Sequence, residues 1–234
     1  MKIIIGNWKM NGDAQLLEKL THAISETATQ NTVIICPPFT LLGGENHGIK
    51  IGAQDISNHE NGAYTGDISA QMVAENGAKY VIVGHSERRL YHHETNEMVR
   101  EKASIAIKHK LIPIICIGET LAEKDSGQTA NVIKNMLEQS LPESESGEFM
   151  IAYEPRWAIG TGKTPTATEI ENVHKMIFEY LQKINHETTP ILYGGSVKPT
   201  NASDIAQIPH VDGLLIGGAS LETETFIPII KSVN

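Results

Sequence analysis

The stretch "FMIAYEPRWAIGTGKTPTATEIENVHKMIFEYLQKI", Phe149 to Ile184, contains one complete strand, loop and helix pattern. Its first residues form an apolar run that is typical of a buried strand. Its second half carries apolar residues at the three- and four-residue spacing that lines one face of a helix, at Ile170, Val173, Ile177, Leu181 and Ile184. The stretch therefore predicts a β-strand that is joined by a glycine-containing loop to an amphipathic helix.

The same pattern recurs along the whole chain. Eight apolar runs predict strands, at Ile3–Trp8, Thr32–Cys36, Lys50–Gln54, Tyr80–Gly84, Ile112–Ile117, Phe149–Tyr153, Ile191–Tyr193 and Gly213–Ile216. Further helices are predicted around the apolar positions Leu16 to Ile24 and at Ser69–Asn76, Thr95–Lys108, Thr129–Glu138, Asn201–Gln207 and Glu224–Ser232. Strands that alternate with helices, without a linker, predict one α/β domain over residues 1–234, a (β/α)₈ barrel rather than an open, doubly wound sheet.

One outer helix departs from this repeat. Between the second and third predicted strands the chain carries Gly43, Gly44 and Gly48, and glycine is a poor helix former. We therefore expect the second outer helix to be short or missing, so that a loop covers this part of the barrel wall.

Composition excludes several classes of function. The net charge of −9, with no basic run longer than Arg88-Arg89, argues against a nucleic-acid or acidic-membrane partner. The three isoleucines near the start are too short for a secretory signal or a membrane span, so a cytoplasmic location is expected. Two widely spaced cysteines, Cys36 and Cys116, neither staple the chain nor make a zinc site, and both are expected to be reduced.

The residues that follow the predicted strands carry the candidate chemistry. In a (β/α)₈ barrel the carboxyl ends of the strands and the loops after them form the active face. These positions hold a carboxylate, an imidazole, an amine, an amide and glycine-rich turns: Glu154, His85, Lys9, Asn7, Ser196, Gly217 and Gly218.

A lone glutamate at a strand end is more often a salt-bridge or capping residue than a base. Glu154, however, precedes Pro155, which fixes the backbone there, and Gly160 and Gly162 follow within the same loop. Such a segment between stiff ends is typical of a mobile lid beside a catalytic group. Thr168 is expected to cap the helix that follows.

His85 and Lys9 each have an ordinary alternative, a satisfied buried histidine and a solvated surface lysine. Ser86 is expected to cap a helical turn, which would place His85 at the positive helix end and disfavour its protonated form. A neutral imidazole would then donate a hydrogen bond rather than act as an acid. Lys9 directly follows an apolar strand, so its amine is expected to face the same pocket as Glu154.

The glycine pairs in "YGGS" and "IGGAS" follow the last two predicted strands. A single pair marks an ordinary turn, but barrels of this kind often bind phosphate with backbone N–H groups at these two loops. Together with Lys9, the pairs predict a small phosphorylated substrate, even though the chain as a whole is acidic.

The motifs "NWKMNG", "VGHSERR", "CIGE", "AYEP", "WAIGTGK" and "YGGS" resemble, in order and spacing, those of the triosephosphate isomerase family, and the resemblance runs from Ile3 to Ser220. It implies a barrel enzyme that forms homodimers and interconverts dihydroxyacetone phosphate and D-glyceraldehyde 3-phosphate in glycolysis and gluconeogenesis. No metal or cofactor is implied.

The resemblance also implies roles for single residues. Glu154 is similar to the family's general base, and His85 to its neutral electrophile, helped by Asn7 and Lys9, while Glu87 is similar to a carboxylate near Lys9. The backbone amides of Gly160, Ser196 and Gly218, with the neighbouring Gly217, would hold the phosphate. In the long loop from His59 to Ser69, Thr65 would approach the region around the partner subunit's Asn7.

Other interpretations stay open at this point. Arg156 stands where the family typically carries a small apolar residue, so the packing at the start of the lid is expected to differ from the family's. Cys116 and Glu119 are interpreted as packing and structural residues. The alternatives are another phosphate-binding barrel enzyme, such as a sugar-phosphate epimerase, or a barrel with a non-enzymatic binding role.

Overall fold

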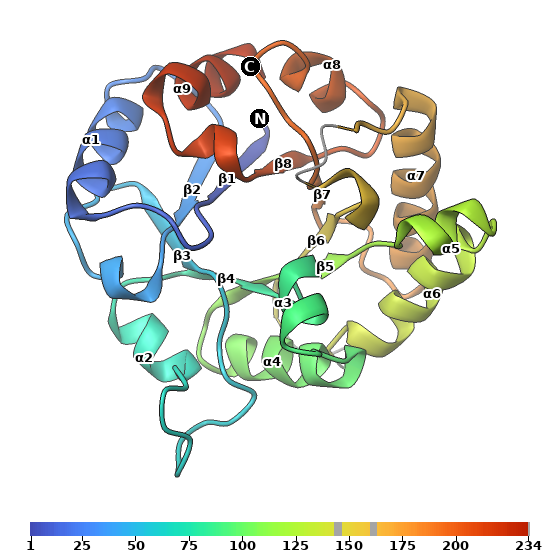
Figure 1. Ribbon diagram of the computed structural model, residues 1–234, viewed down its shortest axis with the longest axis horizontal. Helices are drawn as coiled ribbons and strands as arrows, with labels where there is room; N and C mark the ends of the chain where they lie inside the picture. The colour runs from blue at the N-terminus through green and yellow to red at the C-terminus, as the bar shows by residue number, and fades with distance from the viewer. Residues whose placement is uncertain (143–146, 160–162, 234) are drawn as a thin grey trace.

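The computed structural model describes residues 1–142, 147–159 and 163–233. Within these residues, parallel strands form a closed barrel in chain order and helices surround it (Figure 1). The strands are β1 (Ile3–Asn7), β2 (Thr32–Cys36), β3 (Lys50–Ala53), β4 (Tyr80–Val83), β5 (Ile112–Ile117), β6 (Met150–Tyr153), β7 (Ile191–Tyr193) and β8 (Gly213–Ile216). The barrel predicted from the sequence is therefore confirmed, and each strand boundary lies within one residue of its prediction.

The α-helices form the outer layer. They are α1 (Ala14–Ser25), α2 (Ala70–Glu75), α3 (Ser86–Tyr91), α4 (Asn96–Lys108), α5 (Leu121–Asp125), α6 (Thr129–Ser140), α7 (Ala167–Lys183), α8 (Ala202–Ala206) and α9 (Thr223–Ser232). Short 3₁₀ turns occur at η1 (Phe39–Leu41), η2 (Arg156–Ala158) and η3 (Gly218–Ser220). In the described part of the chain, no helix combines the length and the apolar character that a membrane crossing requires.

The shortened second helix is also confirmed. Every residue between β2 and β3 is described, and the only helical segment there is the single turn η1. The sequence analysis did not predict α5, because its five residues, LAEKD, carry no two apolar side chains three or four positions apart.

The start of α7 differs from the prediction that Thr168 would cap it. The cap is Thr166, whose side chain accepts a hydrogen bond from the Glu169 N–H at 3.2 Å. Glu169 reaches back to the Thr166 N–H at 2.7 Å, which completes a capping box. The reciprocal pair satisfies two backbone N–H groups at once, and this favours Thr166 over Thr168 as the helix cap.

Alternate side chains of the strands divide the core into two layers. In β4, Tyr80 and Ile82 point into the barrel, whereas Val81 and Val83 pack against the helices. The inner layer has Ile5, Ile34, Ile114, Leu192 and Leu215 among its members, and the barrel is therefore filled with side chains. The free space for a ligand lies at the ends of the strands.

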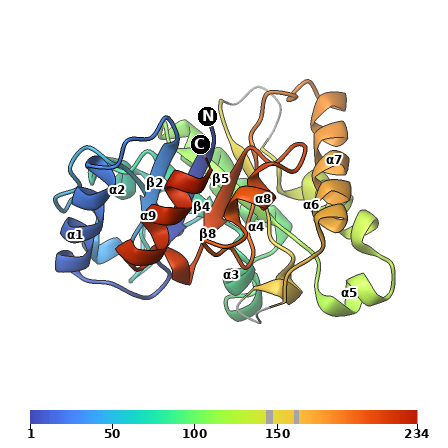
Figure 2. The same ribbon diagram turned by 90° about the horizontal axis from the view of Figure 1, so that it is seen from above.

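The pairing of β8 with β1 closes the barrel, with Ile3 opposite Gly213 and Gly6 opposite Ile216. The helices close in the same way, because α9, the last one, lies beside α1 in both views (Figures 1 and 2). A Cβ atom at Gly213 would lie only 2.1 Å from the Ile3 carbonyl oxygen. Glycine is therefore needed at this seam.

We expect Gly213→Ala to lower the free energy of unfolding by about 1–3 kcal/mol, the usual cost of overpacking, because the added methyl group meets backbone that cannot rotate away. Urea unfolding followed by circular dichroism measures the change. Gly218→Ala is the matched control, since no heavy atom lies within 4 Å of its added methyl group. Equal midpoints for Gly213→Ala and the control would contradict the steric account.

Candidate active site

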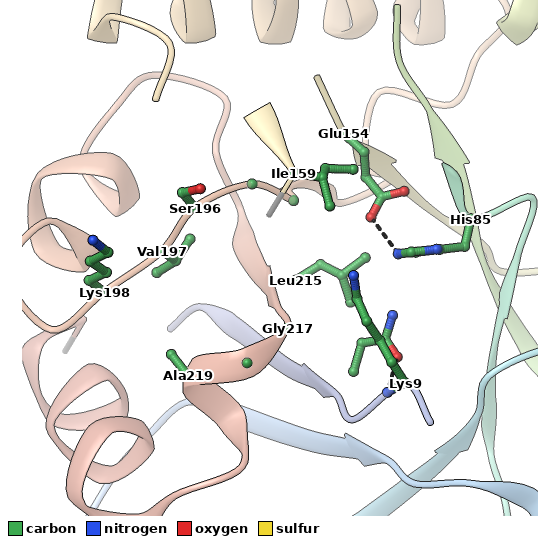
Figure 3. Close-up of a pocket in the computed structure, with 14 residues that line it drawn as sticks. Lys9, His85, Glu154, Ile159, Ser196, Val197, Lys198, Leu215, Gly217 and Ala219 are labelled. Carbon is green, nitrogen blue, oxygen red and sulfur yellow. Dashed lines mark hydrogen bonds and ion pairs between the residues drawn. The ribbon is translucent and has the colours of Figure 1, made fainter. Parts of the chain in front are cut away.

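A cavity of about 310 Å³ opens at the carboxyl end of the barrel strands. Seven residues predicted from the sequence line it: Asn7, Lys9, His85, Glu154, Ser196, Gly217 and Gly218. Figure 3 shows the loops after β7 and β8 along one side of this cavity, with Glu154 and His85 facing each other on the other side. Five separate strands thus deliver one set of polar groups to one place.

Glu154 follows β6 directly and is only 4% exposed. Its Oε1 lies 3.2 Å from Nε2 of His85, and its Oε2 accepts a hydrogen bond from the Ser86 N–H at 3.3 Å. The backbone beside it is tightly packed, because a Cβ atom at Gly118 would lie 1.8 Å from the Glu154 carbonyl oxygen. Both carboxylate oxygens are therefore held by the start of α3 in this arrangement.

His85 itself caps α3, which corrects the prediction that Ser86 would do so. Its Nδ1 accepts a hydrogen bond from the Glu87 N–H at 3.2 Å. Accepting this bond requires a lone pair on Nδ1, so the ring proton of a neutral His85 lies on Nε2. The cap thus selects the tautomer that donates into the cavity.

Burial and the Glu154 carboxylate act in opposite directions on the pKa of His85. Burial lowers it, but the Glu154 carboxylate and its hydrogen bond raise it, and the net result is a pKa above the ordinary histidine value. The expected effect of the helix start is therefore outweighed while Glu154 stays in contact.

Burial also raises the pKa of Glu154, but His85 and the Ser86 N–H more than offset this effect, so the carboxyl pKa lies below its usual range. Glu154 is consequently ionised at neutral pH, as a general base has to be.

Lys9 reaches the cavity through an unusual backbone conformation. Its φ angle is +52°, a value that residues other than glycine seldom adopt. The Lys9 N–H donates to Oδ1 of Asn7 at 3.0 Å, and the Lys9 carbonyl accepts from Nε2 of Gln54 at 2.7 Å. Its amine lies 2.5 Å from Glu87, so the expected pairing of these two residues is present. Strain held by such contacts is common at functional sites.

The glycine-rich loops provide room for an anion. No heavy atom lies within 4 Å of the position of a Cβ atom at Gly218, and at Gly217 the nearest is Cε of Lys9 at 3.5 Å. Ser196 lines the same side, and its hydroxyl donates to the Ala158 carbonyl at 3.0 Å. The two glycines therefore leave room for an anion to approach the main chain in a cavity that Lys9 also lines, as a phosphate site requires.

Three predicted residues are not among those that line this cavity: Glu87, Gly160 and Thr65. Glu87 is the partner of the Lys9 amine. Gly160 lies outside the described residues. Thr65 is exposed, on the loop after β3 that extends away from the barrel in Figure 1.

Glu119 and Arg156 lie just outside the cavity, near Glu154. The Glu119 side chain accepts hydrogen bonds from Tyr153 and Trp157. The backbone carbonyl of Glu119 accepts a hydrogen bond from the Arg156 N–H at 3.0 Å. Cys116 is a free, buried thiol whose pKa burial raises well above the ordinary value, so no thiolate chemistry is supported there.

Gly194 and Gly195, the predicted glycine pair of "YGGS", also line the cavity. It further includes residues that the sequence analysis did not single out: Ile159, Val197, Lys198, Leu215 and Ala219. Lys198 is a second cation near the glycine loops, and its place shortly after "YGGS" was the available signal. Leu215 was hidden by its position inside a strand, because the direction in which the last strand residues point depends on the barrel.

We expect Glu154→Gln to lower the pKa of His85, because it removes the carboxylate that raises this pKa and keeps the burial that lowers it. Nuclear magnetic resonance titration of histidine-labelled protein measures the change, and the spectrum of His85→Gln assigns the resonance. Glu224→Gln, at an exposed glutamate on α9, is the control and should leave His85 unchanged. An unaltered pKa in Glu154→Gln would refute the assigned electrostatics.

Comparison with known proteins agrees with this geometry. The sequence profile of the triosephosphate isomerase family matches residues 2–233. A triosephosphate isomerase of Rhodopseudomonas palustris is 46% identical, covering 97% of this chain and 95% of its own, and one of Bradyrhizobium diazoefficiens is 42% identical, covering 98% and 96%. The structure of triosephosphate isomerase from Bartonella henselae superposes with a TM-score of 0.88 at 39% identity, covering 99% and 98%. The chain therefore belongs to the triosephosphate isomerase family, the isomerases of glycolysis that interconvert dihydroxyacetone phosphate and D-glyceraldehyde 3-phosphate.

Proposed function

We propose that this protein catalyses the interconversion of the two triose phosphates with Glu154 as the general base and His85 as the electrophile. The observation that carries the proposal is the contact between the buried Glu154 carboxylate and Nε2 of His85, 3.2 Å long, at the edge of a cavity that Lys9 also lines. An ionised base, a ring N–H donor and a cation beside one small cavity meet the needs of an aldose–ketose isomerisation.

The reaction moves a carbonyl group between adjacent carbons. Glu154 takes a proton from the hydroxyl-bearing carbon beside the substrate carbonyl, which leaves an enediolate, and returns a proton to the former carbonyl carbon. The hydroxyl proton passes, by way of Nε2 of His85, to the oxygen that was the carbonyl oxygen. The Nε2–H of His85 donates to the substrate oxygen on which negative charge develops, and the ammonium of Lys9 stabilises the same charge. Since Oδ1 of Asn7 accepts from the Lys9 N–H, its amide hydrogens serve as further donors.

The described arrangement is a resting one. His85 carries one proton on Nε2, and Glu154 accepts it here, so this proton cannot serve a substrate oxygen at the same time. Substrate binding therefore has to separate the two side chains. Loss of the carboxylate contact also lowers the pKa of His85, so that the imidazole donates as a neutral group.

The phosphate group is assigned to the side of the cavity opposite Glu154. We place it against the backbone of Ser196, Gly217 and Gly218, with Lys9 at its border. The open space at Gly218 lets phosphate oxygens approach the backbone N–H groups closely. The role of Gly160 in a lid over this group stays a prediction, because residues 160–162 lie outside the described residues.

A homodimer and a cytoplasmic location are part of the proposal. The loop from His59 to Ser69 extends away from the barrel, and Tyr64 at its tip stays 45% exposed although its ring stacks on His59. Met10, beside the catalytic Lys9, is 96% exposed. An exposed aromatic side chain on a projecting loop and an exposed apolar side chain next to the site suit an interface with a second copy. The free cysteines suit a reducing compartment.

We expect the purified wild-type protein to convert glyceraldehyde 3-phosphate rapidly in an assay coupled to reduction of the ketone product. In Glu154→Gln turnover should fall by several orders of magnitude, because an amide cannot accept the carbon-bound proton. The amide keeps the size of the side chain, and circular dichroism checks that the variant is folded. A variant that turns over at the wild-type rate would refute Glu154 as the base.

We expect the wild-type chain, of 25.6 kDa, to sediment as a dimer, and Thr65→Arg to sediment as a monomer because a bulky cation is added at the loop tip. Thr188→Arg, at an exposed threonine between α7 and β7, is the matched control and should stay dimeric. Sedimentation velocity at several concentrations distinguishes the species. A dimeric Thr65→Arg protein would exclude this loop as the interface.

A further inference from the structure

Lys124 of α5 lies outside the cavity and joins two segments that flank it. Its amine lies 3.6 Å from the centroid of the Trp157 ring, within the range of a cation–π interaction. The same amine lies 2.8 Å from Oε1 of Glu169. Trp157 belongs to η2, which follows Glu154 and Pro155, and Glu169 belongs to the first turn of α7. One side chain thus holds chain segments on both sides of residues 160–162.

The Trp157 indole is held on two sides by neighbouring residues of the chain. Its Nε1–H donates to Oε1 of Glu119 at 2.8 Å, while the Lys124 ammonium lies over its face. Oε1 of Glu119 also accepts from the Tyr153 hydroxyl at 3.2 Å, and Glu119 is 1% exposed. A hydrogen-bond acceptor at the ring edge and a cation at the ring face match the charge distribution of an indole.

Glu169 gives Lys124 a fixed partner. The hydrogen bond from Lys124 and that from the Thr166 N–H hold the pKa of the Glu169 carboxyl below its ordinary value, so this group is ionised at neutral pH. Its other oxygen completes the capping box of α7. The ammonium is therefore placed over Trp157 by a helix end that is itself well ordered by its cap.

These contacts bear on the reaction because η2 follows the proposed base, Glu154, in the chain, with only Pro155 between them. Pro155 restricts the backbone between Glu154 and η2, so a displacement of one is transmitted to the other. The resting contact of Glu154 with His85 has to break when substrate binds. Holding η2 in place favours the resting contact and thereby opposes substrate binding.

We propose that Lys124 is a positioning residue that stabilises the resting arrangement of Glu154 through Trp157, an inference that rests on the catalytic roles proposed above. Lys124 touches neither the cavity nor the reacting groups. It acts on the equilibrium between the resting and the productive position of the base, and so on substrate affinity more than on the chemical step.

The test compares Lys124→Met, which removes the charge and keeps an unbranched side chain, with Lys124→Arg, which keeps the charge. A cation–π contact at a partly exposed site corresponds to about a two- to fivefold change in an equilibrium constant. In Lys124→Met we expect KM for glyceraldehyde 3-phosphate, and the inhibition constant of 2-phosphoglycolate, to fall by that factor. We expect kcat to change by less than about twofold, and Lys124→Arg to behave as wild type.

Two further variants distinguish the contacts of Lys124 with Trp157 and Glu169 from general effects of charge and stability. Glu169→Gln keeps the capping box, for which glutamine serves as well, but loses the ion pair with Lys124, so KM should shift in the same direction by a smaller factor. Lys175→Met removes an exposed lysine of α7 that pairs with Glu179, and it should leave KM unchanged.

A spectroscopic measurement tests the contact of Lys124 with Trp157 without any turnover. The chain has two tryptophans, so protein labelled with 5-fluorotryptophan gives two fluorine resonances, and Trp157→Phe assigns them. Without ligand, Lys124→Met should shift the Trp157 resonance and leave that of Trp8 in place, whereas Lys175→Met should shift neither.

An unchanged KM in Lys124→Met, an increased KM, or a loss of kcat would overturn the inference, and so would a change in melting temperature alone. An unshifted Trp157 resonance would overturn it as well. If the wild-type protein fails to turn over glyceraldehyde 3-phosphate, the proposed function fails, while the fluorine spectra still decide whether Lys124 holds Trp157.

Discussion

The parallel pairing of β8 with β1 is the constraint on which the rest of the structure depends. It brings the end of the first strand beside the end of the last, so that Lys9 lies next to Gly217, with 3.5 Å between Cε of Lys9 and the place of a Cβ atom at that glycine. An anion site needs both the amine and the open backbone, and only closure of the barrel supplies them together. The requirement for glycine at position 213, opposite the Ile3 carbonyl, is the steric condition for that closure.

The position of the imidazole depends on a helix that could not form alone. α3 has six residues, too few for an isolated helix to be stable in water. The guanidinium of Arg89 anchors it, with hydrogen bonds to the carbonyls of Gly84 and Cys116 at 2.8 and 3.1 Å and to the side chain of Asn96 at 2.7 Å. The barrel strands and α4 thus hold the start of α3, where His85 faces Glu154. Because both side chains are buried, each determines the charge state of the other.

Most of the fold could be predicted from the sequence, because the strands of a parallel barrel are short apolar runs that turn-forming residues interrupt. The shortened segment after β2 was visible in its glycines. The errors lie where local pattern carries little information. Helix α5 has no two apolar side chains at helical spacing. The helix caps were misassigned at Thr168 and Ser86 because the cap is decided by which side chain reaches which N–H group. Arg156 could be identified as a departure from the family, but its effect on η2 depends on packing around Trp157.

The sequence by itself determined the order of the strands and helices, the membership of the family and the set of residues at the strand ends. It did so because hydrophobic period and turn chemistry are properties of neighbouring residues. Only the tertiary structure decided two contacts, that of Glu154 with His85 and that of Lys124 with Trp157. These contacts join residues from different strands and helices, so their distances depend on barrel closure and helix packing. The pKa directions follow from those distances and from burial, which no local pattern specifies.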